Sequence, residues 1–151
     1  MFGRVWSAHA DRADLTPPVR ALGERLVGRV RFCEWAISTV GPLTLVHGDA
    51  SMQNLRTGPD GEVALLDWED VSAAPGLVDL AWLLVSSVEP ADWDEVIAAY
   101  GPADDLMRVL PAIAVQGLLS WSDTMAGSTE AAAWTHRLGE TARRLAARAS
   151  R

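Results

Sequence analysis

The fold of this chain is decided at residues 43–57, which read LTLVHGDASMQNLRT. The apolar start of this stretch predicts a short strand that places His47 and Asp49 at its end, where loops carry chemistry. The tetrad Gly-Pro-Asp-Gly at residues 58–61 is strong turn chemistry, because proline presets φ while aspartate and glycine tolerate the remaining dihedrals. A second apolar arm follows at residues 62–66, so the segment predicts a β-hairpin.

The two ends of this hairpin carry side chains suited to a metal ion. Asn54 and Asp67 lie at nearly the same distance from the turn, so both finish at its open end. Paired strands lie about 5 Å apart, which lets one cation bridge the two side chains. Mg²⁺ prefers few carboxylate ligands together with an amide oxygen, waters and substrate phosphates. The spacing therefore predicts a magnesium site.

Asp49 lies upstream on the same loop and would face a metal-bound phosphate from the acceptor side. There its carboxylate can take the proton from an attacking hydroxyl. Asp, Asn and Asp in this order suit phosphoryl transfer, in which the protein supplies positioning and charge rather than covalent chemistry. Taken singly, each residue has a structural alternative, such as a turn cap or an exposed loop amide. The alternative for the whole set is a solvated hairpin with acidic ends.

Three segments together carry a family resemblance. HGDASMQN at residues 47–54, LDWE at residues 66–69 and DLA at residues 79–81 resemble the motifs of the aminoglycoside phosphotransferase and choline kinase group of protein-kinase-like enzymes. Two details differ from the usual motifs of that group. Residues 51–53 lack its frequent His-Pro-Gly, and residues 76–79 lack the Asp-Pro that often precedes the helix. Neither difference removes a chemical group.

The resemblance implies a role for each polar residue of these motifs. Asp49 is the catalytic base, while Asn54 and Asp67 hold magnesium. His47 supports the loop from behind, and Asp79 accepts hydrogen bonds from the backbone of the HGD segment. The resemblance further implies ATP, or another nucleoside triphosphate, and Mg²⁺ as cofactors.

The resemblance also implies the fold. We expect an α+β, mainly helical single domain over residues 1–151, a kinase-like C-terminal lobe in which a small β-hairpin carries the catalytic loop. We expect the N-terminal lobe of the family to be absent, because no G-x-G-x-x-G precedes His47 and all 13 Lys-or-Arg positions hold arginine. We therefore expect a fragment of a longer enzyme. A chain that pairs with a separate lobe and a non-catalytic remnant are the alternatives.

In this family the helices that follow the metal aspartate form the acceptor pocket. The expected acceptor is the hydroxyl of a small molecule, such as an aminoglycoside-like antibiotic or an amino alcohol. The candidate substrate residues are Glu69, Asp70, Trp121 and Asp123. Each has a structural alternative: Asp70 as a turn cap, Trp121 as a core residue and Asp123 as part of a solvated face.

Two other functions compete with the phosphotransferase. One is a non-catalytic binding module, in which the apolar ledge normally covered by the N-terminal lobe becomes a contact face, for instance in a homodimer. The other is a metal-dependent hydrolase, since Asp, Asn and Asp also bind metals for hydrolysis. A hydrolase would need further His or carboxylate ligands, which the motifs do not supply.

Composition narrows the class of protein. The chain has 151 residues, of which 49% are apolar and seven are Trp, so a globular domain with a real core is expected. The net charge of −7 argues against a nucleic-acid partner. The start has no signal-peptide run and no stretch reaches membrane-spanning length, so we expect a cytoplasmic protein without a membrane partner. Cys33, the single cysteine, lies on an apolar helical stripe and predicts a buried, inert thiol.

The rest of the chain reads as helices. One long helix should open at Pro17, with Thr16 as its cap, and end at Gly41. Its apolar residues follow a three-four spacing: Val19, Leu22, Leu26, Val30, Cys33 and Ile37. Further helices are expected over residues 2–10, 78–88, 91–100, 103–125 (kinked or restarted at Pro111) and 129–149, the last capped by Ser128 and Thr129.

Overall fold

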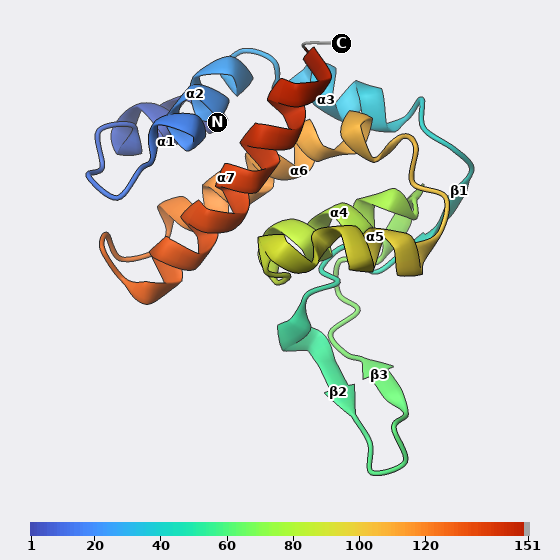
Figure 1. The fold of residues 1–151 in the computed structure, drawn as a ribbon. Coiled ribbons are helices and arrows are strands. Elements are labelled where there is room, and N and C mark those ends of the chain that lie inside the picture. Colours follow the sequence, from blue (N-terminus) through green and yellow to red (C-terminus); the bar gives the residue numbers. More distant parts are fainter. Residues whose placement is uncertain (150–151) are drawn as a thin grey trace.

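The computed structural model describes residues 1–149. It shows a body of helices from which one β-hairpin projects (Figure 1). Short 3₁₀ turns cover Met52–Asn54 and Pro90–Asp92. The helices are α1 (Phe2–His9), α2 (Pro17–Leu26), α3 (Val30–Ile37), α4 (Leu77–Ser86), α5 (Trp93–Tyr100), α6 (Leu106–Ser122) and α7 (Thr129–Ala149). The strands are β1 (Leu43–Val46), β2 (Leu55–Thr57), β3 (Val63–Leu65) and β4 (Ser72–Pro75). The expected α+β, mainly helical class is confirmed.

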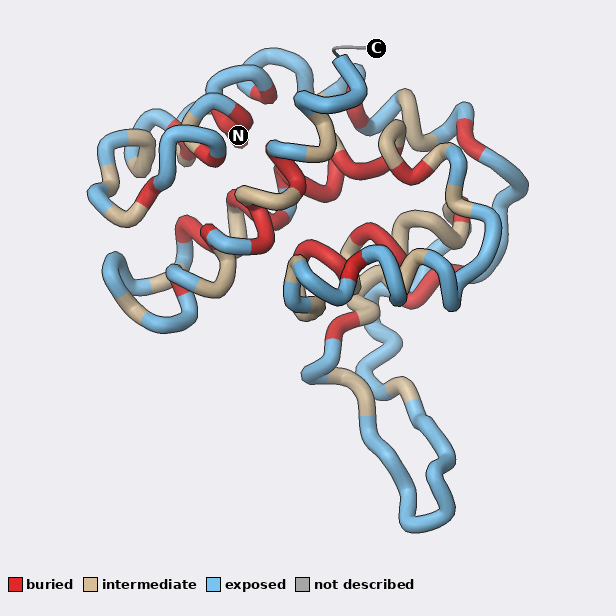
Figure 2. The backbone as a smooth tube through the Cα atoms, in the orientation of Figure 1, coloured by how far each residue is buried: buried red, intermediate tan, exposed pale blue. Residues whose placement is uncertain are grey.

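Helix α6 forms the centre of the core. It is apolar on nearly every face, and α1, α3, α4 and α7 pack around it, so each face has a neighbour to bury it. Figure 2 shows the buried positions concentrated along α6 and on the sides of α4 and α7 that face it. The helix continues through Pro111 as one element, so the proline does not restart it. Within residues 1–149, none of the helices combines the length and apolar character needed to cross a lipid bilayer.

The predicted long helix after Thr16 is wrong in one respect, because it is two helices. The chain breaks between α2 and α3 at Gly28, whose φ of +76° is a left-handed conformation that glycine adopts without a steric penalty. The three-four apolar spacing continues across the break because both helices face the same core. Pro17 opens α2 as expected, whereas the Thr16 side chain makes no capping hydrogen bond. Cys33 is buried as predicted, and this burial raises the pKa of its thiol.

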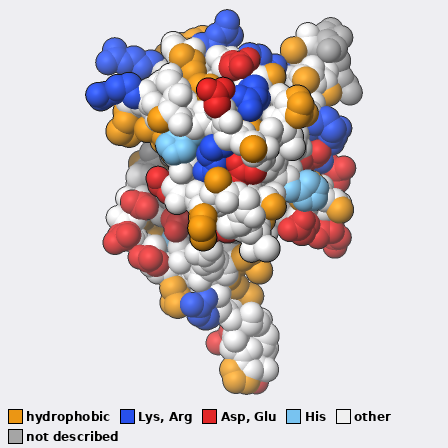
Figure 3. Space-filling view, turned by 90° about the vertical axis from the view of Figure 1, so that its left-hand side faces the viewer, with side chains coloured by type: hydrophobic (Ala, Val, Ile, Leu, Met, Phe, Trp, Pro, Cys, Tyr) orange, Lys and Arg blue, Asp and Glu red, His pale blue; other side chains and the backbone are white. Residues whose placement is uncertain are grey.

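The predicted hairpin is confirmed, and a second sheet accompanies it. In the hairpin, β2 pairs antiparallel with β3, with Leu55 opposite Leu65. In the second sheet β1 pairs antiparallel with β4, which the sequence SAAP did not reveal because it lacks branched and aromatic residues. This pairing brings together the loop that enters the hairpin and the loop that leaves it. Figure 3 shows the hairpin standing clear of the body, with acidic side chains gathered on both flanks of the body above it.

A partly buried ion pair ties the N-terminal helices to the C-terminal ones. The Arg12 guanidinium pairs with Asp14 (Nη2 to Oδ2, 2.6 Å) and donates to the carbonyl oxygen of Thr124 at 3.0 Å. It also lies 4.0 Å above the ring of Trp121. Asp14 in turn accepts the backbone N–H of Gly127 at 3.0 Å. The loop between α1 and α2 is thereby fixed to the segment between α6 and α7.

This ion pair should make stability depend on pH. The hydrogen bond from Arg12 is the main cause that lowers the pKa of Asp14 from 3.8 to about 2. A carboxylate with a lowered pKa contributes stability above its unfolded pKa and loses it as the pH falls through the folded value. Asp14→Asn should therefore lower the free energy of unfolding at pH 7 by about 1–2 kcal/mol. The difference from the parent protein should shrink between about pH 4 and pH 2.

Urea unfolding followed by tryptophan fluorescence at several pH values measures this difference. Asp11→Asn is the matched control, because Asp11 is exposed and lies 3.8 Å from Arg20, so its loss should change the free energy by less than about 0.5 kcal/mol. A difference between Asp14→Asn and the parent that stays constant down to pH 2 would contradict the ion-pair assignment.

Candidate functional site

The loop after β1 is organised around a buried histidine. His47 is 1% exposed, and its Nδ1 accepts the backbone N–H of Asp49 at 3.2 Å. Its Nε2 must then carry the proton, and it donates to the carbonyl oxygen of Leu66 at 2.8 Å. The imidazole thus connects the loop before the hairpin to the end of the hairpin. The ring of Trp68 packs against the imidazole, with 4.7 Å between the two ring centroids.

Asp79 holds the same loop from the other side. It lies in the first turn of α4, and its carboxylate accepts the backbone N–H groups of His47 at 2.7 Å and Gly48 at 3.0 Å. These are the hydrogen bonds expected of Asp79. Gly48 has a φ of +87°, and a Cβ there would lie 2.4 Å from the carbonyl oxygen of Asp70. Only glycine fits this position, so the conformation of the HGD segment beside Asp70 depends on it.

The structure brings Asp49 and Asn54 into direct contact. Nδ2 of Asn54 donates to Oδ2 of Asp49 and to its backbone oxygen, both at 2.9 Å. Nε1 of Trp82 donates to the other carboxylate oxygen, Oδ1. Since the two oxygens at Nδ2 require a donor, the amide oxygen of Asn54 must point away from them, and it makes no hydrogen bond within residues 1–149. This oxygen is therefore available to a cation.

Asp67 is exposed and follows the strand pairing of β2 with β3 at the end that contains Asn54. The N–H of Leu66 donates to the carbonyl oxygen of Asn54 at 2.8 Å, so Asp67 is one residue beyond the cross-strand partner of Asn54. Asp67 has a φ of +65° and is the one non-glycine residue with positive φ in the described part of the chain. Such a conformation costs about 1 kcal/mol or more and is concentrated at functional sites.

The donor atoms at this point fit magnesium. The carboxylate of Asp67 and the amide oxygen of Asn54 are hard oxygen donors, and Mg²⁺ combines one or two such ligands with water and substrate phosphates. Over residues 1–149 no group of three or more His, Cys, Asp or Glu is placed to hold a metal ion.

A pocket of about 270 Å³ opens beside Asp49. It lies between the 3₁₀ turn after the loop, the C-terminal end of α4, α6 and the first turns of α7. The residues that line it, besides Asp49, are Ser51, Gln53, Trp82, Ser86, Ser87, Ser120, Glu130, Trp134 and Arg137. A hydroxyl-bearing molecule in this pocket would meet the carboxylate of Asp49.

These lining residues were not predicted from the sequence. Glu130, Trp134 and Arg137 share one face of α7, because helical positions four and three residues apart are neighbours. This shared face was the feature of the sequence that could have indicated a site on α7. It could not be assigned to the site, because α7 follows Asp49 by about eighty positions and nothing in the sequence says which helix covers the loop. Trp82 was hidden in the apolar run of α4.

None of the four predicted substrate residues lines this pocket. Trp121 is wrong as a substrate contact, because its side chain is completely buried and is covered by the guanidinium of Arg12. Asp123 is exposed at the C-terminus of α6. Glu69 and Asp70 are exposed in the loop after Asp67 and stay predictions.

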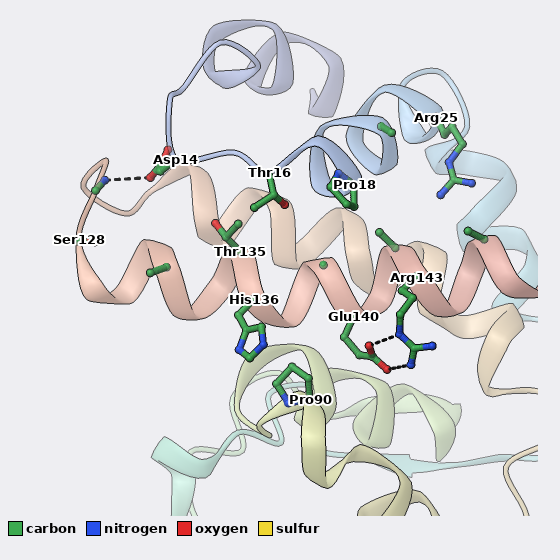
Figure 4. A pocket seen from close by; sticks show the side chains of 16 residues that line it. Asp14, Thr16, Pro18, Arg25, Pro90, Ser128, Thr135, His136, Glu140 and Arg143 are labelled. Carbon is green, nitrogen blue, oxygen red and sulfur yellow. Dashed lines mark hydrogen bonds and ion pairs between the residues drawn. The ribbon is translucent and has the colours of Figure 1, made fainter.

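A larger cavity of about 980 Å³ lies elsewhere, between α2 and α7 (Figure 4). Thr16, Pro18 and Arg25 line it from the side of α2, and Arg143 and His136 belong to α7, where His136 points toward Pro90. The residues at its wall do not include Asp49, Asn54 or Asp67. Cavity size therefore does not identify the site, and the smaller pocket is the better candidate because Asp49, the predicted catalytic residue, lines it.

One comparison with known proteins gives a match. The model of the phosphotransferase enzyme family, APH, matches residues 4–114. These residues include the HGD loop, the hairpin and Asp79, and they end before α7. No curated protein and no solved structure matches the chain significantly. Since the match covers well over half of the sequence, the chain belongs to the phosphotransferase enzyme family.

Proposed function

We propose that this protein is a kinase-like phosphotransferase lobe that uses ATP and Mg²⁺ to phosphorylate a hydroxyl of a small molecule. The observation that carries the proposal is the hydrogen-bonded unit of Asp49 and Asn54, one cross-strand step from Asp67. Family membership supports phosphoryl transfer in general. The unit supports the finer assignment, because a carboxylate and an amide oxygen lie together one cross-strand step from a second carboxylate, as a base and two oxygen ligands would require.

Asp49 is the proposed base. A carboxylate has about four lone-pair positions, of which Trp82 and Asn54 occupy one on each oxygen. The remaining positions are free to accept a hydroxyl proton from a molecule in the pocket. The two donors also fix the direction of the carboxylate, so little reorganisation is needed during the reaction. In the transfer, the acceptor oxygen bonds to the γ-phosphorus, the bond to the bridging oxygen breaks with its electrons leaving on ADP, and the proton goes to Asp49.

The amide oxygen of Asn54 and the carboxylate of Asp67 would hold Mg²⁺. When bound, the metal supplies positive charge that offsets the charge of the phosphates. His47 and Asp79 keep this geometry by binding the loop backbone and the carbonyl of Leu66. Their contribution is positioning.

Nucleotide binding tests the metal site. Asp67→Asn should weaken Mg²⁺-dependent ATP binding by about tenfold or more, because it removes the single anionic ligand among the two proposed. Calorimetric titration of ATP with and without Mg²⁺ measures the effect. Asp60→Asn, in the exposed turn of the same hairpin, is the matched control and should bind as the parent does. Equal ATP affinity with and without Mg²⁺ in the parent protein would refute the metal site.

Turnover tests the base. Asp49→Ala should lower kcat for phosphorylation of an accepted hydroxyl compound by about 100-fold or more, which is the usual contribution of general base catalysis. ATP binding should stay within about threefold of the parent, because the proposed nucleotide ligands are unchanged. A coupled ADP-release assay and the same titration give both values. A parallel loss of turnover and ATP binding would contradict the role of Asp49.

A binding module is the second candidate. Leu43 and Leu45 point out from β1 with exposed fractions of 66% and 70%, and Val63 on the hairpin is 68% exposed. Exposed apolar side chains that lie together, as Leu43 and Leu45 do two residues apart on β1, are typical of interaction surfaces. Absence of ATP binding together with concentration-dependent dimerisation in sedimentation experiments would favour this function over the phosphotransferase.

A further inference from the structure

Arg137 is a buried cation with unused hydrogen-bond donors. Its side chain is on α7, and the residue is 8% exposed. Nε donates to the carbonyl oxygen of Val85 at 2.9 Å, and the guanidinium lies 5.2 Å above the ring of Trp134. Within residues 1–149 it forms no salt bridge, and its two Nη atoms make no hydrogen bond to protein. A charged group in this state lacks its normal compensation.

A nearby acidic charge compensates the charge of Arg137 only in part. Burial lowers the pKa of Arg137, and the charge of Glu89 opposes this effect only in part. Glu89 is itself exposed and lies 3.6 Å from His136. Val85 is in the last turn of α4, so the Nε hydrogen bond caps that helix. Capping uses one of the five donors of arginine and leaves the terminal fork available.

The fork belongs to the same pocket as Asp49. Arg137 and Asp49 both line the 270 Å³ pocket, together with the rings of Trp82 and Trp134. A guanidinium fork matches a carboxylate with two parallel hydrogen bonds, which is the strongest form of this pairing. Arg137 lies beyond the residues that match the family, so membership of the family does not account for it.

We propose that the pocket accepts a small hydroxy acid, whose carboxylate pairs with Arg137 while its hydroxyl faces Asp49. This inference rests on the proposed function of Asp49. A singly charged carboxylate suits the pocket better than a phosphate, because one cation stands there beside the carboxylates of Asp49 and Glu130. The volume is below the usual range for drug-sized ligands, which favours a compact acceptor over a multi-ring one. Glu130 at the exposed side can bind an ammonium group, which extends the class to hydroxy amino acids.

The first experiment changes the ligand and leaves the protein intact. Calorimetric titration of the full chain compares 4-hydroxybutyrate with 4-hydroxybutanamide, and L-serine with L-serinamide. Within each pair the amide replaces the carboxylate at nearly constant shape. Each acid should bind at least about tenfold more tightly than its amide, since a charged, bidentate pairing is lost. Equal affinities within both pairs, or no binding of either acid at millimolar concentration, would overturn the proposal.

The second experiment changes the protein. Arg137→Met should abolish the preference for the acids, and Arg137→Lys should restore part of it, because lysine keeps the charge without the fork. Arg148→Met is the matched control on an exposed part of α7 and should keep the full preference. If Arg137→Met does not fold, the pairs of acid and amide on the parent protein still decide the question.

ATP titration separates the two proposals. Binding of ATP with Mg²⁺ but of neither acid would overturn the hydroxy acid and leave the phosphotransferase in place. Binding of the acids that depends on Arg137, without ADP release in the presence of ATP and Mg²⁺, would support the pocket assignment and refute the proposed function. Retained ATP affinity in Arg137→Met would show that the loss is confined to the acceptor side.

Discussion

The site depends on one interaction, the pair of hydrogen bonds from the backbone of His47 and Gly48 to the carboxylate of Asp79. The pairing of β1 with β4 ends at Val46, so these two N–H groups have no strand partner. Asp79 satisfies both and adds a negative charge that each bond gains from. Because Asp79 belongs to α4, it also fixes the loop to the helical core. Asp49 therefore starts from a position set by the core and not by the exposed hairpin.

The two carboxylates of the site, those of Asp49 and Asp67, are held differently. Asp49 is held by Trp82 and Asn54, and its loop is connected through His47 to the end of the hairpin. Asp67 is exposed and has a strained backbone. The fixed carboxylate of Asp49 suits the role of base proposed for it, because misplacement of the reacting groups is costly in rate. The exposed carboxylate of Asp67 suits the role proposed for it, because a metal ligand on the surface can take up a cation that arrives and leaves with a nucleotide.

Two arginines, Arg12 and Arg137, are largely covered by the protein but differ in how their charge is compensated. Arg12 is paired with Asp14 and covers Trp121, so its charge is compensated within the chain and stabilises the packing of α1 against α6. Arg137 is buried, yet it has no acidic partner in the described residues. An uncompensated charge reduces stability unless something binds to it. This contrast is the physical basis for assigning Arg137 to a ligand.

The sequence alone determined the parts that depend on neighbouring positions: the strand before His47, the turn at residues 58–61, the order of Asp49, Asn54 and Asp67, and membership of the family. The tertiary structure decided the rest. Apolar spacing shows that a helix has a buried face, but it does not show which element covers that face. For this reason the burial of Trp121 and the lining of the pocket by Trp134 and Arg137 could not be read from the sequence. The strand β4 was equally hidden, because its pairing with β1 comes from the partner and not from its own composition.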